Sequence, residues 1–259
     1  MSGHYDDVLA RGRRGTVRVA LVGGGVAVAL VATVVALLAW TGSAPTPAAL
    51  DTPTTPPAGS TSPTAPGAEV LTTPGLAVVM PDDLVWRDVV GVALPYSASK
   101  GPSNTLGGLA KGFAHDAPGA VLAAAHIIIR INPQAGPDVF QPTLREQVVG
   151  PGADPVRTMT AGAYAALREH AGVPYGEPVG QVDGALRGFR VENYTDTDTD
   201  VRLVTEWLDS GGQPTSAALM LHMSWSGNDW VLVAPIGGDF LATNVTLDEA
   251  SIYTPIGAG

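Results

Sequence analysis

The longest apolar stretch of the chain is a run of 22 uncharged residues from Val19 to Trp40. At about 1.5 Å per residue, a helix of this length spans roughly 33 Å, enough to cross a hydrocarbon core about 30 Å thick. A cleaved signal peptide would carry a shorter apolar region, of about 7 to 15 residues, that ends at a small-residue site. The pattern therefore predicts an uncleaved transmembrane helix over residues 19–40.

Residues 41–75 have a different character, because they are rich in Pro, Thr, Ser and Ala and contain few large apolar side chains. Such a composition cannot supply a core and favours extended polyproline conformations. We expect a disordered linker that holds the following domain, residues 76–259, away from the membrane.

The first half of this domain shows helical periodicity. Asp116 is predicted to cap a helix that has Pro118 in its first turn and stops at Asn132-Pro133. Its apolar face is formed by Ala120, Val121, Ala124, Ile127, Ile128 and Ile131. A second helix is expected from Thr143 to Val149, and a third from Asp154-Pro155 to near Ala171-Gly172.

Alternation of apolar and polar positions with period two predicts strands elsewhere in the domain. An early strand is expected from Leu84 to Val92, in a segment that covers the core. The later strands are Ala185 to Tyr194, Val201 to Asp209, Ser216 to Trp225 and Trp230 to Ala234. The four-residue connection Ser226 to Asp229 joins the last two strands as a hairpin. Helices followed by antiparallel strands predict an α+β fold, with helices packed on a curved antiparallel sheet.

Charge adds an orientation to this arrangement. The formal net charge of the chain is -10; residues 1–18 carry four arginines against two aspartates, or +2, so the rest carries -12. Because basic residues favour the cytoplasmic side, we expect a short cytoplasmic tail (1–18), a single membrane crossing and a domain outside the cell membrane. The acidic balance argues against direct nucleic-acid binding through a broad basic surface, and the predicted membrane helix makes the lipid bilayer an expected partner.

Cofactor and metal chemistry finds little support in the sequence. The chain has no cysteine, which excludes disulfides and thiol catalysis, and its five histidines show no zinc-binding spacing. His126 lies among Ala and Ile and is interpreted as a core or helix-surface histidine. No cofactor, metal-binding or catalytic residue is therefore assigned.

Three acidic residues, Asp196, Asp198 and Asp200, imitate the first ligands of a calcium-binding loop. The match fails at its sixth position, where Val201 replaces the required Gly, and at its twelfth, where Trp207 replaces the bidentate acid. We interpret the segment as a solvated hairpin turn, and weak binding of extracellular calcium remains an alternative.

Nucleophile and acid–base candidates are equally sparse. The sequence has no G-x-S-x-G motif, and its Gly23–Gly25 run lies inside the predicted membrane helix. His115-Asp116 could suggest acid–base chemistry, but Asp116 is better explained as the helix cap. Tyr164, Asp183 and Tyr194 could serve an isomerase-like site only if they converged in one pocket.

Several short motifs between Gly101 and Gly150 resemble uncharacterised membrane-anchored proteins of actinobacterial conjugative and integrative elements. The motifs are Gly101-Pro102, Gly112-Phe113-Ala114-His115, Pro118-Gly119-Ala120, Ala123-Ala124, Pro142-Thr143-Leu144-Arg145 and Val149-Gly150. Helices followed by hairpins with Trp225 and Trp230 at a late turn are also similar to the nuclear transport factor 2-like (SnoaL-like) cone fold. A tail, one membrane helix and an exported domain of that fold resemble the bitopic assembly subunit of type IV secretion systems.

This resemblance implies a scaffolding role without catalysis. The leading hypothesis is a non-enzymatic structural subunit of a conjugation or type IV secretion-like DNA-transfer apparatus, with other transfer-apparatus membrane proteins and further copies of itself as its partners. The alternative is an extracytoplasmic ligand-binding protein that uses the pocket of a cone fold, and the third is an enzyme of the ketosteroid isomerase kind. A cone interior filled by Leu, Met and Trp would oppose the last two hypotheses.

Overall fold

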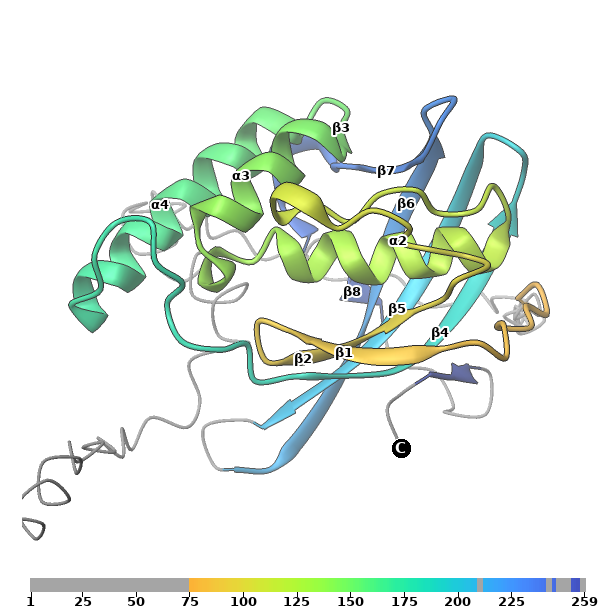
Figure 1. Ribbon diagram of the computed structural model, residues 1–259, viewed down its shortest axis with the longest axis horizontal. Helices are drawn as coiled ribbons and strands as arrows, with labels where there is room; N and C mark the ends of the chain where they lie inside the picture. Colours follow the sequence, from red (N-terminus) through yellow and green to blue (C-terminus); the bar gives the residue numbers. More distant parts are fainter. Residues whose placement is uncertain (1–74, 209–211, 241–243, 246–252, 257–259) are drawn as a thin grey trace, which may run out of the picture.

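Three α-helices lie on one face of a curved sheet in the described part of the chain, which comprises residues 75–208, 212–240, 244–245 and 253–256 of the computed structural model (Figure 1). The predicted α+β class is confirmed. The sheet is mixed rather than purely antiparallel, because one of its strand pairs is parallel. The predicted tail, the predicted membrane helix and residues 41–74 of the predicted linker fall outside the described residues. Among the helices of the described residues, none has the length and apolarity to cross a membrane.

Helix α2 (Ala117–Arg130) begins where the sequence predicts. The Asp116 side chain accepts a hydrogen bond from the Gly119 N–H at 2.9 Å, which satisfies one of the unpaired donors of the first turn. The helix is the centre of the domain, since most of its residues from Ala117 to Ile127 are buried. At its end the Asn132 Oδ1 accepts from the Gln134 N–H and opens the short 3₁₀ helix η2 (Pro133–Ala135).

The predicted helix from Thr143 to Val149 is wrong in its bounds. Helix α3 runs from Pro137 to Glu146 and contains Pro142, the residue directly before the predicted start at Thr143. Gly136, with φ of 81°, precedes the helix, and Pro137 supplies a first residue that needs no N–H partner. After α3, Val148–Val149 form strand β3, which pairs in parallel with Leu232 and Val233.

Helix α4 (Ala153–Ala171) agrees with the predicted third helix. It ends on Gly172, whose left-handed φ of 67° suits a residue without a side chain. Only one face of α4 is buried, along Ala153, Val156, Thr160 and Tyr164.

The single early strand predicted from Leu84 to Val92 is instead a hairpin. Strand β1 (Val85–Val89) and strand β2 (Val92–Tyr96) pair around a two-residue turn, Val90-Gly91, in which both residues have positive φ. The prediction that this segment covers the core is confirmed, since Leu94 of β2 is fully buried.

The later strands match their predictions to within a few residues. They are β4 (Ala185–Tyr194), β5 (Asp198–Leu208), β6 (Pro214–Trp225) and β7 (Trp230–Val233), with the short β8 (Asn244–Val245) and β9 (Thr254–Pro255). The order across the sheet is β3-β7-β6-β5-β4-β9, and β8 pairs with β6. The predicted hairpin at 226–229 is confirmed by the pairing of Trp225 with Trp230.

The main core lies between α2 and the concave face of the sheet. Leu203, Leu221, Met223 and Trp230 are fully buried there. Val204, Ala218 and Tyr253 form a small second cluster. Val204 and Ala218 lie on the face of the sheet opposite to the main core, because successive side chains of a strand point to opposite faces. Tyr253, near the C-terminus, packs on that second face.

Candidate functional site: an apolar pocket beside helix α2

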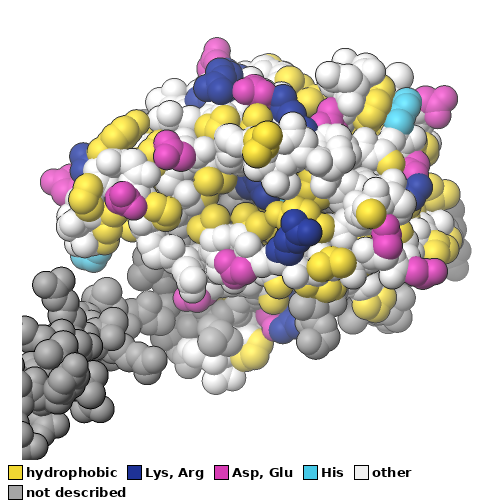
Figure 2. All heavy atoms as spheres, in the orientation of Figure 1, with side chains coloured by type: hydrophobic (Ala, Val, Ile, Leu, Met, Phe, Trp, Pro, Cys, Tyr) yellow, Lys and Arg dark blue, Asp and Glu magenta, His cyan; other side chains and the backbone are white. Residues whose placement is uncertain are grey.

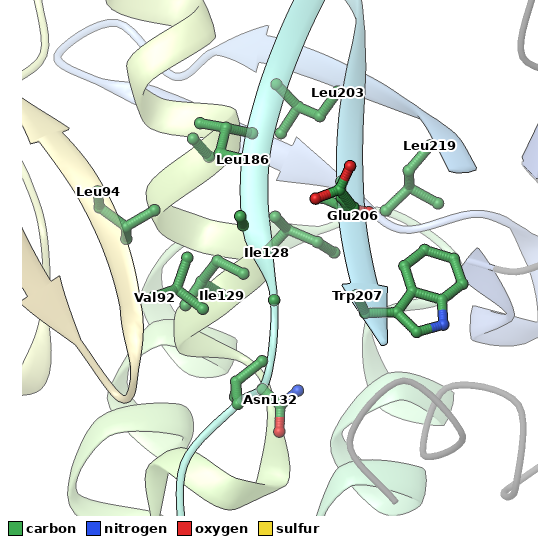
Figure 3. Close-up of a pocket in the computed structure, with 15 residues that line it drawn as sticks. Val92, Leu94, Ile128, Ile129, Asn132, Leu186, Leu203, Glu206, Trp207 and Leu219 are labelled. Carbon is green, nitrogen blue, oxygen red and sulfur yellow. The ribbon is translucent and has the colours of Figure 1, made fainter. Parts of the chain in front are cut away.

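An apolar pocket of about 130 Å³ opens between α2, strand β2 and the sheet (Figure 3). Three parts of the fold contribute its walls: the last turns of α2, the β1–β2 hairpin, and the sheet strands β4, β5 and β6. The lining residues of the helix and hairpin are Ala125, Ile128, Ile129, Asn132, Val92 and Leu94. The lining residues of the sheet side are Val182, Gly184, Ala185, Leu186, Leu203, Thr205, Glu206, Trp207 and Leu219.

The side chains of α2 become less buried where the helix reaches the pocket. The helix residues from Leu122 to Ile127 are all buried, whereas Ile128 and Ile129 are only partly buried. Both isoleucines point to the region where the pocket opens, and Figure 3 shows them between the hairpin side chains and those of the sheet. A helix face that would otherwise be sealed thus carries two accessible apolar side chains.

Small residues create the space. Ala125 on α2 is buried, and Gly184 with Ala185 stands at the start of β4. A Cβ added at Gly184 would meet only the Glu206 carbonyl oxygen, at 3.6 Å, so the hollow is not filled from that side. Larger side chains at these three positions would occupy the pocket.

Three polar side chains belong to the pocket lining, those of Thr205, Glu206 and Asn132. The Glu206 carboxylate accepts from Arg187 Nη2 at 2.6 Å and from Arg187 Nε at 3.1 Å, so its charge is balanced by a bidentate partner. Asn132 lies at the edge of the pocket (Figure 3). The Oδ1 of Asn132 is held by the Gln134 N–H at 2.9 Å, which orients the amide.

The domain interior is filled at one end and hollow at the other. Beyond the pocket, toward β7, the fully buried side chains of Leu221, Met223 and Trp230 leave the core closed. The sequence-based test, whether Leu, Met and Trp fill the interior, thus has a divided outcome. The hollow end retains space for a ligand, and its lining is mostly apolar.

Comparison of the sequence with known protein families gives a family for this chain. A profile described as Domain of unknown function (DUF8175) matches residues 43–255. The chain belongs to this family. Curated proteins and solved structures yielded no match. The DUF8175 range includes every residue that lines the pocket and also most of the Pro/Thr-rich segment.

His126 is a core residue of the DUF8175 domain, as the sequence predicts. It is fully buried; its Nε2 donates to the Pro95 carbonyl at 2.8 Å, and its Nδ1 accepts from Arg130 Nη1 at 2.6 Å. Burial, and then the Arg130 guanidinium, lower the pKa of His126 from its usual 6.5 to about 3. The imidazole is therefore neutral and satisfied by protein partners.

Tyr164, Asp183 and Tyr194 do not form one site. The Tyr164 hydroxyl donates to the Glu177 carbonyl and accepts from the Gly176 N–H, beside α4. Asp183 and Tyr194 lie eleven residues apart along one extended segment, a span of roughly 35 Å at about 3.3 Å per residue. None of the three lines the apolar pocket.

The acidic turn lies between β4 and β5. Asp196 is in the turn, where its carbonyl oxygen contacts His115 Nε2, while Asp198 and Asp200 are on β5. Asp200 Oδ1 lies 2.7 Å from His222 Nδ1 of the neighbouring strand, and Asp198 lies 3.7 Å from His222 Nε2. Among the described residues no cluster of His, Asp and Glu has the arrangement of a metal site.

His115 and Asp116 serve separate purposes. Asp116 caps α2 and pairs with Lys100 Nζ at 2.5 Å, as the cap interpretation predicts. The His115 ring instead stacks on Trp225, with ring centroids 3.9 Å apart.

A serine–lysine spacing, Ser97-Ala98-Ser99-Lys100, was missed in the sequence, although S-x-x-K is a known nucleophile motif. The Ser97 hydroxyl donates to Asp83 at 2.6 Å and accepts from the Lys100 N–H, so it stabilises a turn. Since the Lys100 ammonium is paired with Asp116, this motif is not arranged as a nucleophile and its base.

A second hollow, of about 240 Å³, is polar and lies where the β6–β7 turn meets the end of α3. Its buried residue Asp229 accepts hydrogen bonds from the N–H groups of Gly112, Phe113 and Trp230. Burial raises the pKa of Asp229, against the opposing effect of these three donors. Asp229 therefore fastens the loop at Gly112 and Phe113 to the last hairpin.

Proposed function

We propose that the chain is a non-enzymatic, membrane-anchored structural subunit of a conjugation or type IV secretion-like DNA-transfer apparatus. Its N-terminus is cytoplasmic, and its α+β domain acts outside the membrane. The domain, in this proposal a cone fold of the nuclear transport factor 2-like kind, contacts other transfer proteins or further copies of itself.

The observation that carries this proposal is the order of segments along the chain. An arginine-rich tail precedes an apolar run long enough to cross a bilayer, and a Pro/Thr-rich linker separates that run from a folded domain. This plan places a domain at a distance from the membrane, as an assembly subunit requires. The separate positions of Tyr164, Asp183 and Tyr194 also favour a structural role over isomerase chemistry.

Transfer frequency in a mating experiment tests the proposal. Deletion of the gene from a donor strain should lower DNA transfer at least about 100-fold, and the full chain should restore it. A chain that ends at residue 75, and so keeps only the anchor and linker, should fail to restore transfer although it reaches the membrane. Undiminished transfer from the deletion strain would contradict the proposal.

A matched variant separates scaffolding from catalysis. The triple change Tyr164→Phe, Asp183→Asn and Tyr194→Phe removes the groups that an isomerase-like site would use. Transfer should remain within about twofold of the wild type, because each substitution nearly keeps the size of its side chain. Tyr164→Phe also removes the hydrogen bonds to Glu177 and Gly176, so folding of the triple variant is verified first. Loss of transfer by a correctly folded triple variant would favour the enzyme hypothesis.

A second function is favoured by the pocket beside α2. A concave, mostly apolar hollow with a few polar groups is typical of small-molecule sites. We propose, as the alternative, an extracytoplasmic ligand-binding protein. Binding of any small molecule that is lost when the pocket is filled by a larger side chain would support this alternative.

A further inference from the structure

We propose that the pocket beside α2 selects small, uncharged, ring-sized molecules that carry one hydrogen-bond acceptor, and that Asn132 recognises the acceptor. This inference rests on the alternative function, the ligand-binding protein, and names its ligand class. The size, the charge and the polar contact of the ligand each follow from a separate feature of the pocket.

Volume limits the size of the ligand. The pocket holds about 130 Å³. An apolar cavity of about 150 Å³ in another protein accommodates one benzene molecule. One six-membered ring with a short substituent therefore fits, with the substituent at the open edge. Fused multi-ring molecules exceed the space unless the walls move.

Shape and lining favour a flat apolar molecule. Leu94 and Leu203 of the lining are fully buried, whereas Ile128 and Ile129 are only partly buried and keep apolar surface accessible to water. Trp207 lies at the β5 wall (Figure 3). A ring placed against the partly buried side chains removes their apolar surface from water, which is the main source of affinity in such sites.

Charge excludes ionised ligands. Glu206 is the charged residue of the pocket lining, and it already holds Arg187 through two hydrogen bonds. A bound carboxylate would leave water without a cation to receive it, and a bound ammonium would have to compete with the Arg187 guanidinium. The pocket therefore favours a neutral molecule over either ion of the same size.

Asn132 supplies the hydrogen bond. Its Oδ1 is occupied by the Gln134 N–H, while its Nδ2 has no hydrogen-bond partner among the residues that the structure describes. The amide is only partly buried and belongs to the pocket lining (Figure 3). A ligand carbonyl or ether oxygen at the pocket edge would accept from this amide, which distinguishes such a ligand from a hydrocarbon of equal size.

Fluorine NMR of the full chain tests the inference. The chain is labelled with 5-fluorotryptophan and held in lipid nanodiscs, and the Trp207 resonance is assigned with Trp207→Phe. Acetophenone, toluene, benzoate and benzylammonium are titrated separately. The Trp207 resonance should shift with acetophenone and toluene, with acetophenone at least about threefold tighter and with both ions at least about tenfold weaker than acetophenone.

Two variants locate the binding. Ala125→Leu fills the pocket and should weaken acetophenone and toluene at least about tenfold, whereas Ala161→Leu, on the exposed face of α4, should leave both unchanged. Asn132→Asp keeps the acceptor for the Gln134 N–H but removes the amide donor. It should weaken acetophenone to the level of toluene and leave toluene within about twofold.

The outcomes separate the ligand class from the proposed function. Equal binding of the neutral and ionic probes, or an unchanged preference in Asn132→Asp, would overturn the selectivity. If the ring probes fail but decanoate shifts Trp207 and Ala125→Leu blocks it, the pocket binds ligands of another class, and only the present inference falls. If neither the ring probes nor decanoate shifts Trp207, the ligand-binding function falls as well.

Discussion

The buried pair His126 and Arg130 links the folded state to pH. The guanidinium of Arg130 donates to His126 Nδ1 and to the Tyr96 hydroxyl, and the helix end at Arg130 favours a positive charge. Arg87 lies over the Tyr96 ring, 4.7 Å from its centroid, so two cations share one aromatic neighbour. A third positive charge, on His126, would have no counterion in this arrangement.

Acid should therefore destabilise the domain through His126. The pKa of His126 is about 3 in the folded state and about 6.5 when unfolded, so the unfolded chain binds the proton first as the pH falls. The free energy of unfolding should fall by about 2 kcal/mol between pH 7.5 and pH 5 from this residue. Chemical unfolding of the full chain, followed by tryptophan fluorescence at each pH, measures the slope.

Histidine variants isolate that contribution. His126→Gln should be less stable at pH 7.5 but should lose the pH-dependent part assigned to His126, because glutamine does not titrate. The exposed His170 offers the matched change, and His170→Gln should keep the slope of the wild type. A slope that is the same in wild type and His126→Gln would show that another group is responsible.

At the level of elements, Gly152, directly before helix α4, and Gly162, within it, have opposite requirements. A Cβ at Gly152, before the helix, would lie 1.8 Å from the Pro235 carbonyl oxygen, so the backbones are in close contact there. A Cβ at Gly162, in the exposed middle of the helix, would meet nothing within 4 Å. The same substitution should thus have opposite effects at the two positions.

Gly162→Ala should raise the free energy of unfolding by about 0.5 to 1 kcal/mol, because alanine loses less backbone entropy in a helix. Gly152→Ala should lower it by about 1 to 3 kcal/mol, since α4 must move away from Pro235. Thermal and denaturant unfolding of the two variants measure the difference. Equal effects would contradict the close approach at Gly152.

The elements also show which parts of the fold could be predicted. Helix α2 and strands β4 to β7 follow from local signals: a cap at Asp116, period-two alternation, and polar turns. The β1–β2 hairpin was missed because Val90-Gly91 lacks the usual Asn-Gly or Asp-Gly turn signal. Strand β3 has only two residues, and its parallel partner is far away in the sequence, so no local pattern announces it.

The pocket could not be predicted for a related reason. Its space depends on Ala125 of α2 lying across the pocket from Gly184 and Ala185 at the start of β4, and none of these residues is unusual in its own sequence context. The structural, non-ligating role of His126, by contrast, was predictable, because its neighbours on the helix are Ala and Ile. Sequence patterns thus identified the buried helix face but not the point at which its burial ends.

At the scale of the whole molecule, the proposed topology makes a direct prediction. Protease added to intact cells should cut between residues 41 and 75, where the Pro/Thr-rich composition favours an accessible chain, and release a fragment that contains the domain. An epitope placed before residue 11 should stay protected until the cells are permeabilised. Protection of the region after Gly75 would refute the orientation.

The contacts between the β6–β7 turn and the loop before α2 join residues far apart in the sequence, which affects the order in which the domain folds. Asp229 and Trp230 bind the backbone at Gly112, Phe113 and Ala114, more than a hundred residues earlier. During synthesis, α2 therefore emerges long before the partners that cover its apolar face and secure its leading loop. A nascent chain interrupted before β7 would present that face to chaperones and proteases, so cellular quality control can tell a truncated copy from a finished one.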